Sequence, residues 1–127
     1  MDSPKILVIN PGSTSTKIAV YQNGTCLMQQ NIRHYLDELI HYPTIISQFE
    51  FRKDLIEGTL EMEGFPLNEI KIVMGRGGLT YQLESGVYEV DDRMLTHVRK
   101  GVLGQHASNL GPLLSHSIAK EIPGAKA

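Results

Sequence analysis

Two short β-branched runs on either side of a polar loop open the chain. Residues 5–9 (KILVI) are too short for a helix and apolar enough for a buried strand, and residues 17–21 (KIAVY) resume this pattern. Between them, residues 10–16 (NPGSTST) are mostly small and rich in hydroxyl groups, as in a hairpin loop. Asn23-Gly24 predicts a tighter hairpin turn that leads into a third strand over residues 25–33. The opening therefore predicts a sheet with antiparallel neighbours.

A helix and a further strand follow this opening. From Pro43 onward, large side chains recur every three or four residues on one helical face: Ile45, Phe49, Arg52, Ile56 and Leu60. Pro43 suits the first turn of such a helix, and Gly64 with Pro66 ends it. Residues 70–74 (IKIVM) predict a second buried strand, which runs into the sharp loop GRGG at 75–78.

The last third of the chain predicts a hairpin and two helices. Residues 81–83 and 87–90 alternate around Gly86, and Asp91 is placed to cap a short helix. A final amphipathic helix covers residues 107–122 and stops at Pro123-Gly124. Strands that alternate with helices predict an α/β fold. Because no strand follows the last helix, we expect the chain to be the first half of a larger unit.

Composition narrows the class of protein. The 127 residues suffice for one domain, and the net charge of −2 excludes the broad positive field of most nucleic-acid-binding proteins. No apolar run approaches the roughly 20 residues that span a bilayer, so neither a nucleic acid nor a membrane is an expected partner. A single cysteine, Cys26, suits the reducing cytoplasm and is expected in the core. His34 and His41 form no zinc pattern and are expected in a solvated segment.

The loop at residues 10–17 has the chemistry of a phosphate site. Its candidate binding residues are small, hydroxylated or basic: Gly12, Ser13, Thr14, Ser15 and Lys17. Consecutive amides in a tight turn can bind an anion, and the Asn10 amide oxygen can reach a metal ion. The spacing is not that of a Walker P-loop, and a strand rather than a helix follows. A polar hairpin turn without a ligand remains the alternative.

Two further candidates follow the second buried strand. Arg76 lies between glycines, and a guanidinium group binds a carboxylate or phosphoryl group through two hydrogen bonds. Taken alone, the spacing favours a solvated loop position for Arg76. His106 precedes the last helix, where anions gather, although a histidine there can simply cap the helix. Ser108 and Asn109 are candidates for the same cap.

The ordered set of motifs resembles a known family. Residues 6–21 look like the opening of the butyrate kinases, within the acetate and butyrate kinase family. Residues 75–79 (GRGGL), 86–88 (GVY) and 106–111 (HASNLG) resemble later motifs of that family in the same order. Acetate kinases carry a longer, histidine-flanked version of the Arg76 loop, so residues 74–78 are closer to the butyrate type. The resemblance implies the ribonuclease-H-like fold of acetate kinase, sugar kinases, Hsp70 and actin, with a mixed sheet flanked by helices.

The resemblance also implies a role for each candidate. The loop from Gly12 to Lys17 would approach the phosphates of ATP or ADP, and Asn10 would help to hold the accompanying Mg²⁺. Arg76, with Gly77 and Gly78, would bind the short-chain carboxylate or acyl phosphate and steady the transferred phosphoryl group. His106 would donate a hydrogen bond to a phosphoryl oxygen. A homo-oligomer is expected, as is usual in this family.

The same resemblance limits what this chain can do alone. Residues 1–127 would form the N-terminal half of a two-domain kinase, and the family's catalytic aspartate, adenosine-binding loops and C-terminal domain would lie beyond them. We therefore expect negligible kinase activity from the isolated chain. Two other functions stay open at this point: a non-catalytic phosphate-binding or self-associating half-domain, and a phosphatase of the same superfamily. The glycine-flanked Arg76 argues against the phosphatase.

Overall fold

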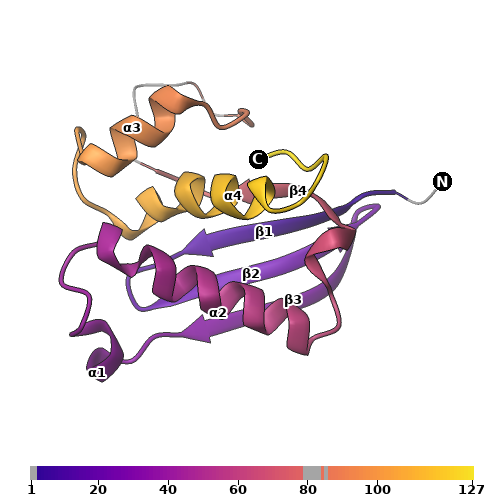
Figure 1. The fold of residues 1–127 in the computed structure, drawn as a ribbon, viewed down its shortest axis with the longest axis horizontal. Coiled ribbons are helices and arrows are strands. Elements are labelled where there is room, and N and C mark those ends of the chain that lie inside the picture. Colours follow the sequence, from indigo (N-terminus) through magenta and orange to yellow (C-terminus); the bar gives the residue numbers. More distant parts are fainter. Residues whose placement is uncertain (1–2, 79–83, 85) are drawn as a thin grey trace.

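The computed structural model describes residues 3–78, 84 and 86–127 as a two-layer α/β arrangement (Figure 1). Its sheet has the strand order β3-β2-β1-β4, and its strands are β1 (Lys5–Pro11), β2 (Ser15–Gln22), β3 (Thr25–Arg33) and β4 (Ile70–Gly75). The α-helices are α1 (Leu36–Leu39), α2 (Phe49–Met62), α3 (Asp92–Lys100) and α4 (Leu110–Lys120). Short 3-10 turns occupy Ile46–Gln48, Leu67–Glu69 and Ala107–Asn109.

The sheet is mixed, as the sequence predicts. β1 pairs antiparallel with β2 and parallel with β4, while β2 pairs antiparallel with β3. The turn between β2 and β3 consists of Asn23 and Gly24, whose φ angles of 52° and 78° both lie in the left-handed region. A two-residue turn of this kind matches the twist of its strands. All four predicted strands from this part of the sequence are therefore confirmed.

The core lies between the sheet and helices α2 and α4, which cover one of its faces (Figure 1). The sheet contributes alternate apolar side chains, such as Leu7, Ile9, Ile18, Val20 and Val73. The helices contribute stripes three or four residues apart, including Ile56, Leu60, Leu110, Leu114 and Ile118. No helix in the described part of the chain has both the length and the apolar character needed to cross a membrane.

The start of the first long helix differs from its prediction. Helix α2 begins at Phe49 after the 3-10 turn Ile46–Gln48, so Pro43 lies outside its first turn. The helical segment is instead preceded by Thr44 and Ser47, whose side chains each accept from the other's backbone amide at 3.1–3.2 Å. These two hydroxyl groups satisfy amides that a helix start leaves free, which a proline at position 43 cannot do.

The region before α3 also differs in part. Residues 87–90 form no strand, because the Val90 amide donates to the carbonyl oxygen of Ala127 at 3.1 Å instead of entering a hairpin. The partner segment of the predicted hairpin, residues 81–83, lies outside the described residues. The prediction for α3 is confirmed: Asp91 accepts from the Met94 amide at 2.9 Å, and Gly101 ends the helix in the left-handed conformation.

The residues after α4 return to the sheet. Lys126 forms a parallel bridge with Ile72, in which the Val73 amide donates to Lys126 and the Lys126 amide donates to Lys71. No strand follows α4 in the described residues, as the sequence predicts, but this isolated bridge brings the end of the chain to the edge of the sheet beside β4. Helix α4 connects β4 to a parallel neighbour, which is the usual role of a helix in an α/β fold.

Two side chains lie at depths opposite to those predicted. Cys26 is exposed, and it lies on β3, an edge strand of the sheet. His34 is only 2 % exposed, because the chain turns inward after β3 and packs the imidazole against the Phe51 ring at a centroid distance of 5.4 Å.

Candidate functional site

The candidate residues are brought together at one end of the sheet, where β1 and β4 end and α4 begins (Figure 1). The Arg76 amide donates to the Ile9 carbonyl oxygen at 2.8 Å, which fixes the start of the 75–78 loop beside the end of β1. The carboxyl ends of parallel strands are where α/β sheets place their ligands. The structure therefore places the polar loop and the Arg76 loop next to each other.

The polar loop is shorter than the sequence predicts. β1 extends to Pro11 and β2 begins at Ser15, and the Gly12 amide donates to the Ser15 carbonyl oxygen at 2.7 Å. Asn10 and Lys17 are direct partners across the β1–β2 pair, so their side chains share one face of the sheet. Ser13 and Thr14 alone occupy the exposed tip of the loop.

A buried arginine holds this loop from beneath. Arg52, on α2, is 0 % exposed, and its Nη1 donates to the carbonyl oxygens of Gly12 and Ser15 at 2.7 and 3.1 Å. Its Nη2 donates to the Ser13 carbonyl oxygen at 3.3 Å. The remaining loop carbonyl, that of Thr14, accepts from the His34 amide at 2.8 Å. Every carbonyl from residue 12 to residue 15 is therefore bound to the protein.

These contacts orient the loop amides. In a planar trans peptide the N–H points opposite to the preceding C=O, so an inward carbonyl means an outward amide. The amides of Ser13 and Thr14 thus point away from Arg52 and His34, and within the described structure they donate to no protein group. The Gly12 amide is occupied by Ser15, so Gly12 does not supply the free donor that the sequence suggests. Two outward amides remain for an anion.

His34 and Thr16 complete the layer beneath the loop. The Thr16 Oγ1 lies 2.8 Å from His34 Nε2 and accepts from Arg52 Nη1 at 3.2 Å. Burial, and then the charge of Arg52, lowers the pKa of His34 to about 4. The imidazole is therefore neutral at physiological pH, and Arg52 carries the positive charge of this layer.

The glycines around Arg76 have a packing role that the sequence does not reveal. A Cβ atom on Gly75 would overlap the Gly111 carbonyl, and one on Gly77 would lie 2.8 Å from the Ser108 Cβ. Gly77 also has a φ of +84°, which disfavours any side chain there. These residues let the start of α4 approach the end of β4, whereas the sequence suggests that they make room for a ligand. The Arg76 side chain itself is exposed.

His106 lies beside this glycine-rich loop, since Ser108 touches Gly77. Its Nδ1 accepts from the Ser108 amide at 3.0 Å and lies 2.8 Å from the Ser108 Oγ, so it caps the 3-10 turn Ala107–Asn109. When Nδ1 accepts, the neutral ring carries its proton on Nε2. The cap therefore leaves Nε2–H as an exposed donor, and capping and ligand binding are compatible. Asn109 is buried and donates to Gly104 at 3.0 Å.

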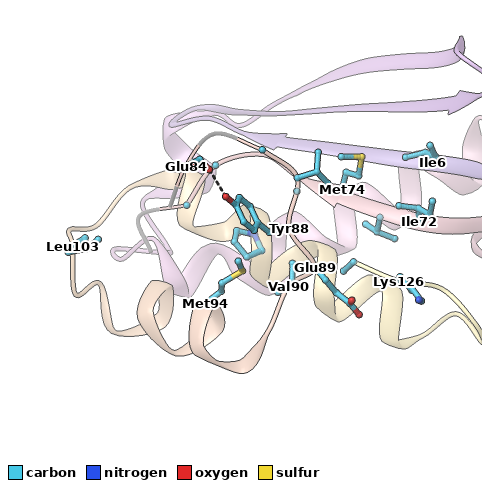
Figure 2. A pocket seen from close by; sticks show the side chains of 18 residues that line it. Ile6, Ile72, Met74, Glu84, Tyr88, Glu89, Val90, Met94, Leu103 and Lys126 are labelled. Atoms are coloured by element: carbon cyan, nitrogen blue, oxygen red, sulfur yellow. Dashed lines mark hydrogen bonds between the residues drawn. The ribbon is translucent and has the colours of Figure 1, made fainter. Parts of the chain in front are cut away.

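Gly75, Gly77 and Gly78 help to line a cavity of about 840 Å³ (Figure 2). Its walls are mostly apolar and include Met74, Tyr88, Met94 and Pro112, and the Tyr88 hydroxyl donates to the Glu84 carbonyl oxygen at 2.7 Å. No residue from 10 to 17 lines it. The cavity is thus lined by the glycines next to Arg76, but not by Arg76 or the polar loop.

The donor set for a metal ion is sparse. Among residues 3–78, 84 and 86–127 there is no group of three or more histidine, cysteine, aspartate or glutamate side chains that could hold one. The Asn10 amide oxygen is the candidate ligand at the end of β1. Such a set fits a Mg²⁺ that keeps its waters and arrives on nucleotide phosphates, as this ion usually does.

Sequence reasoning missed Arg52 and His34 as parts of this site. The periodicity places Arg52 on the apolar face of its helix, among positions otherwise occupied by isoleucine, leucine and phenylalanine. A charged side chain on such a face requires buried hydrogen-bond partners, and that was the available signal. Nothing local in the sequence distinguishes His34 from the exposed His41.

The arrangement of the sheet and helices matches that of a carboxylate kinase. The fold is similar to the crystal structure of acetate kinase from Entamoeba histolytica, with a TM-score of 0.57 and 15 % identity, over 93 % of this chain and 34 % of that one. The α/β, ribonuclease-H-like fold expected from the sequence is therefore confirmed. No family model matches the chain.

Curated relatives narrow the class further. The chain is 45 % identical over 120 residues to a probable butyrate kinase of Clostridium botulinum. This aligned segment covers 94 % of the chain and 34 % of the relative. It is 47 % identical over 116 residues to butyrate kinase 2 of Clostridium acetobutylicum, covering 91 % of the chain and 33 % of the relative. The chain spans about one third of the length of these relatives. It is homologous to the butyrate kinases over that third.

Proposed function

We propose that the chain forms the N-terminal part of a butyrate-type carboxylate kinase. The reaction is reversible phosphoryl transfer: a carboxylate oxygen of butanoate attacks the γ-phosphorus of ATP, and the bond to ADP breaks. The products are butanoyl phosphate and ADP. The observation that supports the proposal is that the polar loop, the Arg76 loop and the residues around His106 lie at one end of the sheet, in a homologue of butyrate kinases.

Each element takes one part of the reacting system. The outward amides of Ser13 and Thr14, with Lys17 and the hydroxyl of Ser15, bind the nucleotide phosphates. Arg76 binds the carboxylate and the transferring phosphoryl group, and His106 donates from Nε2 to a phosphoryl oxygen. Phosphoryl transfer depends mainly on positioning and on neutralising charge, which these donors supply.

A magnesium ion belongs to this proposal as part of the nucleotide. The Asn10 amide oxygen would hold it, together with phosphate oxygens and water. When bound, Mg²⁺ neutralises phosphate charge. Lys17, the direct partner of Asn10 on β2, supplies a second positive group on the same face of the sheet.

The alkyl group of the acid has a matching surface. Gly75 and Gly77, the direct neighbours of Arg76, line the apolar cavity to which Met74, Met94 and Pro112 also contribute. We propose that the carboxylate lies on the Arg76 side and the hydrocarbon tail on the cavity side. A cavity of about 840 Å³ is much larger than a four-carbon tail, so these walls do not by themselves select chain length.

The remaining parts of the active site are assigned to sequence outside these 127 residues, since the relatives are about three times as long. We propose a second domain that closes over the nucleotide, a homo-oligomeric enzyme, and a cytoplasmic location. On this basis the isolated chain binds phosphate but has negligible turnover.

A chimaera tests the proposal. This chain would replace the aligned 116-residue segment of butyrate kinase 2 from Clostridium acetobutylicum. With MgATP and butyrate we expect the chimaera to form acyl phosphate, trapped as the hydroxamate, and the isolated chain to form none. A folded chimaera that binds ATP but transfers no phosphoryl group would overturn the proposed function, and turnover by the isolated chain near ~10 s⁻¹ would overturn its assignment as an incomplete kinase.

A further inference from the structure

The charge of Arg52 has no carboxylate partner in the described structure. Its hydrogen bonds reach only neutral oxygens, of which the side-chain acceptors are Gln48 Oε1, at 3.1 Å from Nε and 2.8 Å from Nη2, and Thr16 Oγ1. Arg52 belongs to neither of the ion pairs Lys5–Glu69 and Lys53–Glu121. A fully buried cation without a counter-ion is costly and uncommon.

The surroundings of Arg52 do not remove its charge. Burial lowers the pKa of its guanidinium group to about 10, so the group remains protonated at neutral pH. The neighbouring His34 is neutral at this pH, because its burial and the charge of Arg52 lower its pKa. The guanidinium therefore gives the loop above it a positive potential.

The position of Arg52 indicates where an anion would lie. The guanidinium group donates to carbonyl oxygens on the inner side of the loop. The amides of Ser13 and Thr14 point outward from the opposite side of the loop. An anion on those amides is separated from the guanidinium by a single layer of peptide planes. Charges at this separation interact strongly when the cation is buried, because water screens it poorly.

We propose that Arg52 is the positioning residue of the phosphate loop, and that the bound polyphosphate anion is its counter-ion. This inference rests on the proposed function, since it concerns the same loop. Arg52 acts in two ways: it fixes the carbonyls inward so that the amides face the anion, and it places a buried charge behind them. It does not touch the anion itself.

Gln48 offers a variant that separates these two actions. Gln48→Glu keeps an oxygen acceptor of nearly the same shape for Arg52, but it gives the guanidinium a carboxylate. The loop is then still held, and the fold is at least as stable as before. If the buried charge attracts the anion, affinity falls; if Arg52 only holds the loop, affinity stays the same.

The probe is inorganic pyrophosphate, titrated at low ionic strength into the ¹⁵N-labelled 127-residue chain while amide resonances are followed by NMR. We expect the Ser13 and Thr14 amides to shift in the wild type. We expect Gln48→Glu to bind about three-fold more weakly, and Arg52→Gln about ten-fold more weakly or worse. Lys53→Gln is the control, because it removes one positive charge from the next residue, whose ion-pair partner is Glu121 and not a group of the loop.

The titrations distinguish a failure of the proposed counter-ion role from a failure of the phosphate-loop assignment. Equal affinity in the wild type and Gln48→Glu, or equal losses in Gln48→Glu and Lys53→Gln, would overturn the proposal that the anion is the counter-ion of Arg52 and leave the proposed function standing. A wild type whose Ser13 and Thr14 amides do not respond would overturn the assignment of the loop to phosphate, and this inference with it. Gln48→Glu keeps the test valid if Arg52→Gln does not fold.

Discussion

Gly75 and Gly111 lie back to back, so that no side chain fits between the end of β4 and the first turn of α4. The contact is between backbone atoms, since a Cβ on Gly111 would lie 2.5 Å from the Arg76 carbonyl oxygen. This close approach sets the distance between the Arg76 loop and the residues that precede α4, including His106. The candidate site thus depends on two residues that have no side chain.

Gly111→Ala should therefore destabilise the fold by about 1–3 kcal/mol, because the added methyl group forces α4 away from β4. Urea denaturation of the chain measures this directly. Gly58→Ala is the matched control: Gly58 lies within α2, and no atom comes within 4 Å of an added Cβ. Alanine favours a helix more than glycine does, so the free energy of unfolding of the control should rise by about 0.5–1 kcal/mol. Equal stabilities for the two variants would contradict the packing argument.

His34 should make the stability of the protein depend on mild acidity. The unfolded imidazole binds its proton below its ordinary pKa of 6.5, while burial and Arg52 hold the folded pKa at about 4. Between these two pKa values the unfolded state binds more protons than the folded state. The contribution of His34 to the free energy of unfolding therefore has its full value above pH 6.5 and falls as the pH drops toward 4. The full loss is at most about 3 kcal/mol.

His34→Gln tests this pH dependence. The variant cannot take up a proton there, so its free energy of unfolding should change less between pH 6.5 and pH 4 than that of the wild type. His41→Gln, at an exposed position a few residues on, should leave the wild-type dependence intact. A His34→Gln profile parallel to the wild type would show that the buried imidazole does not titrate in this range.

The sequence predicts the elements of this fold better than the contacts between them. The strand pattern at residues 5–9, the Asn23-Gly24 turn and the Asp91 cap are local signals, and the structure confirms each. The strand predicted at residues 87–90 is absent, and the Val90 amide instead pairs with Ala127, a partner 37 positions away that periodicity cannot identify. Long-range hydrogen bonds outweigh local strand propensity there.

The same limit applies to the candidate site. The loop at residues 10–17 and the glycines around Arg76 are visible as motifs, but their partners are not. Arg52 lies 36 to 40 positions from the loop oxygens that it binds, and Ser108 lies 31 positions from Gly77. The motifs therefore predict an anion site, while the groups that shape its loops come from elements brought together by folding.

Arg76→Ala should reduce acyl phosphate formation without unfolding the protein. Its side chain is exposed, so truncation leaves no cavity in the core. If Arg76 binds the carboxylate and the phosphoryl group, kcat/KM in the chimaera should fall by roughly 30- to 1000-fold, or about 2–4 kcal/mol. Arg99→Ala removes another exposed arginine, on α3, and should change little. A loss of stability with unchanged kcat/KM would assign Arg76 a structural role only.

A cluster of charges between α2 and α4 should give a second pH dependence of opposite sign. Lys53 Nζ lies 3.0 Å from Glu121 Oε1, and Glu57 faces the same carboxylate. Burial, a hydrogen bond with Glu121 and the negative charge of Glu121 raise the pKa of Glu57 to about 7, against the attraction of Lys53. Between the unfolded pKa of 4.5 and the folded pKa of about 7, the folded state binds more protons than the unfolded state. The contribution of Glu57 to the free energy of unfolding therefore has its full value below pH 4.5 and is lost as the pH rises through 7.

Glu57→Gln should therefore stabilise the protein at pH 8, because the neutral amide keeps a hydrogen bond to Glu121 without adding a second negative charge. After allowance for solvent screening, the expected gain in the free energy of unfolding is about 1 kcal/mol. At pH 4.5, where Glu57 is protonated in the folded state, the variant and the wild type should be equally stable. Glu61→Gln, one turn further along α2 and exposed, should have no effect at either pH. Stabilisation by Glu57→Gln that is the same at both pH values would show that the shared proton between α2 and α4 does not exist.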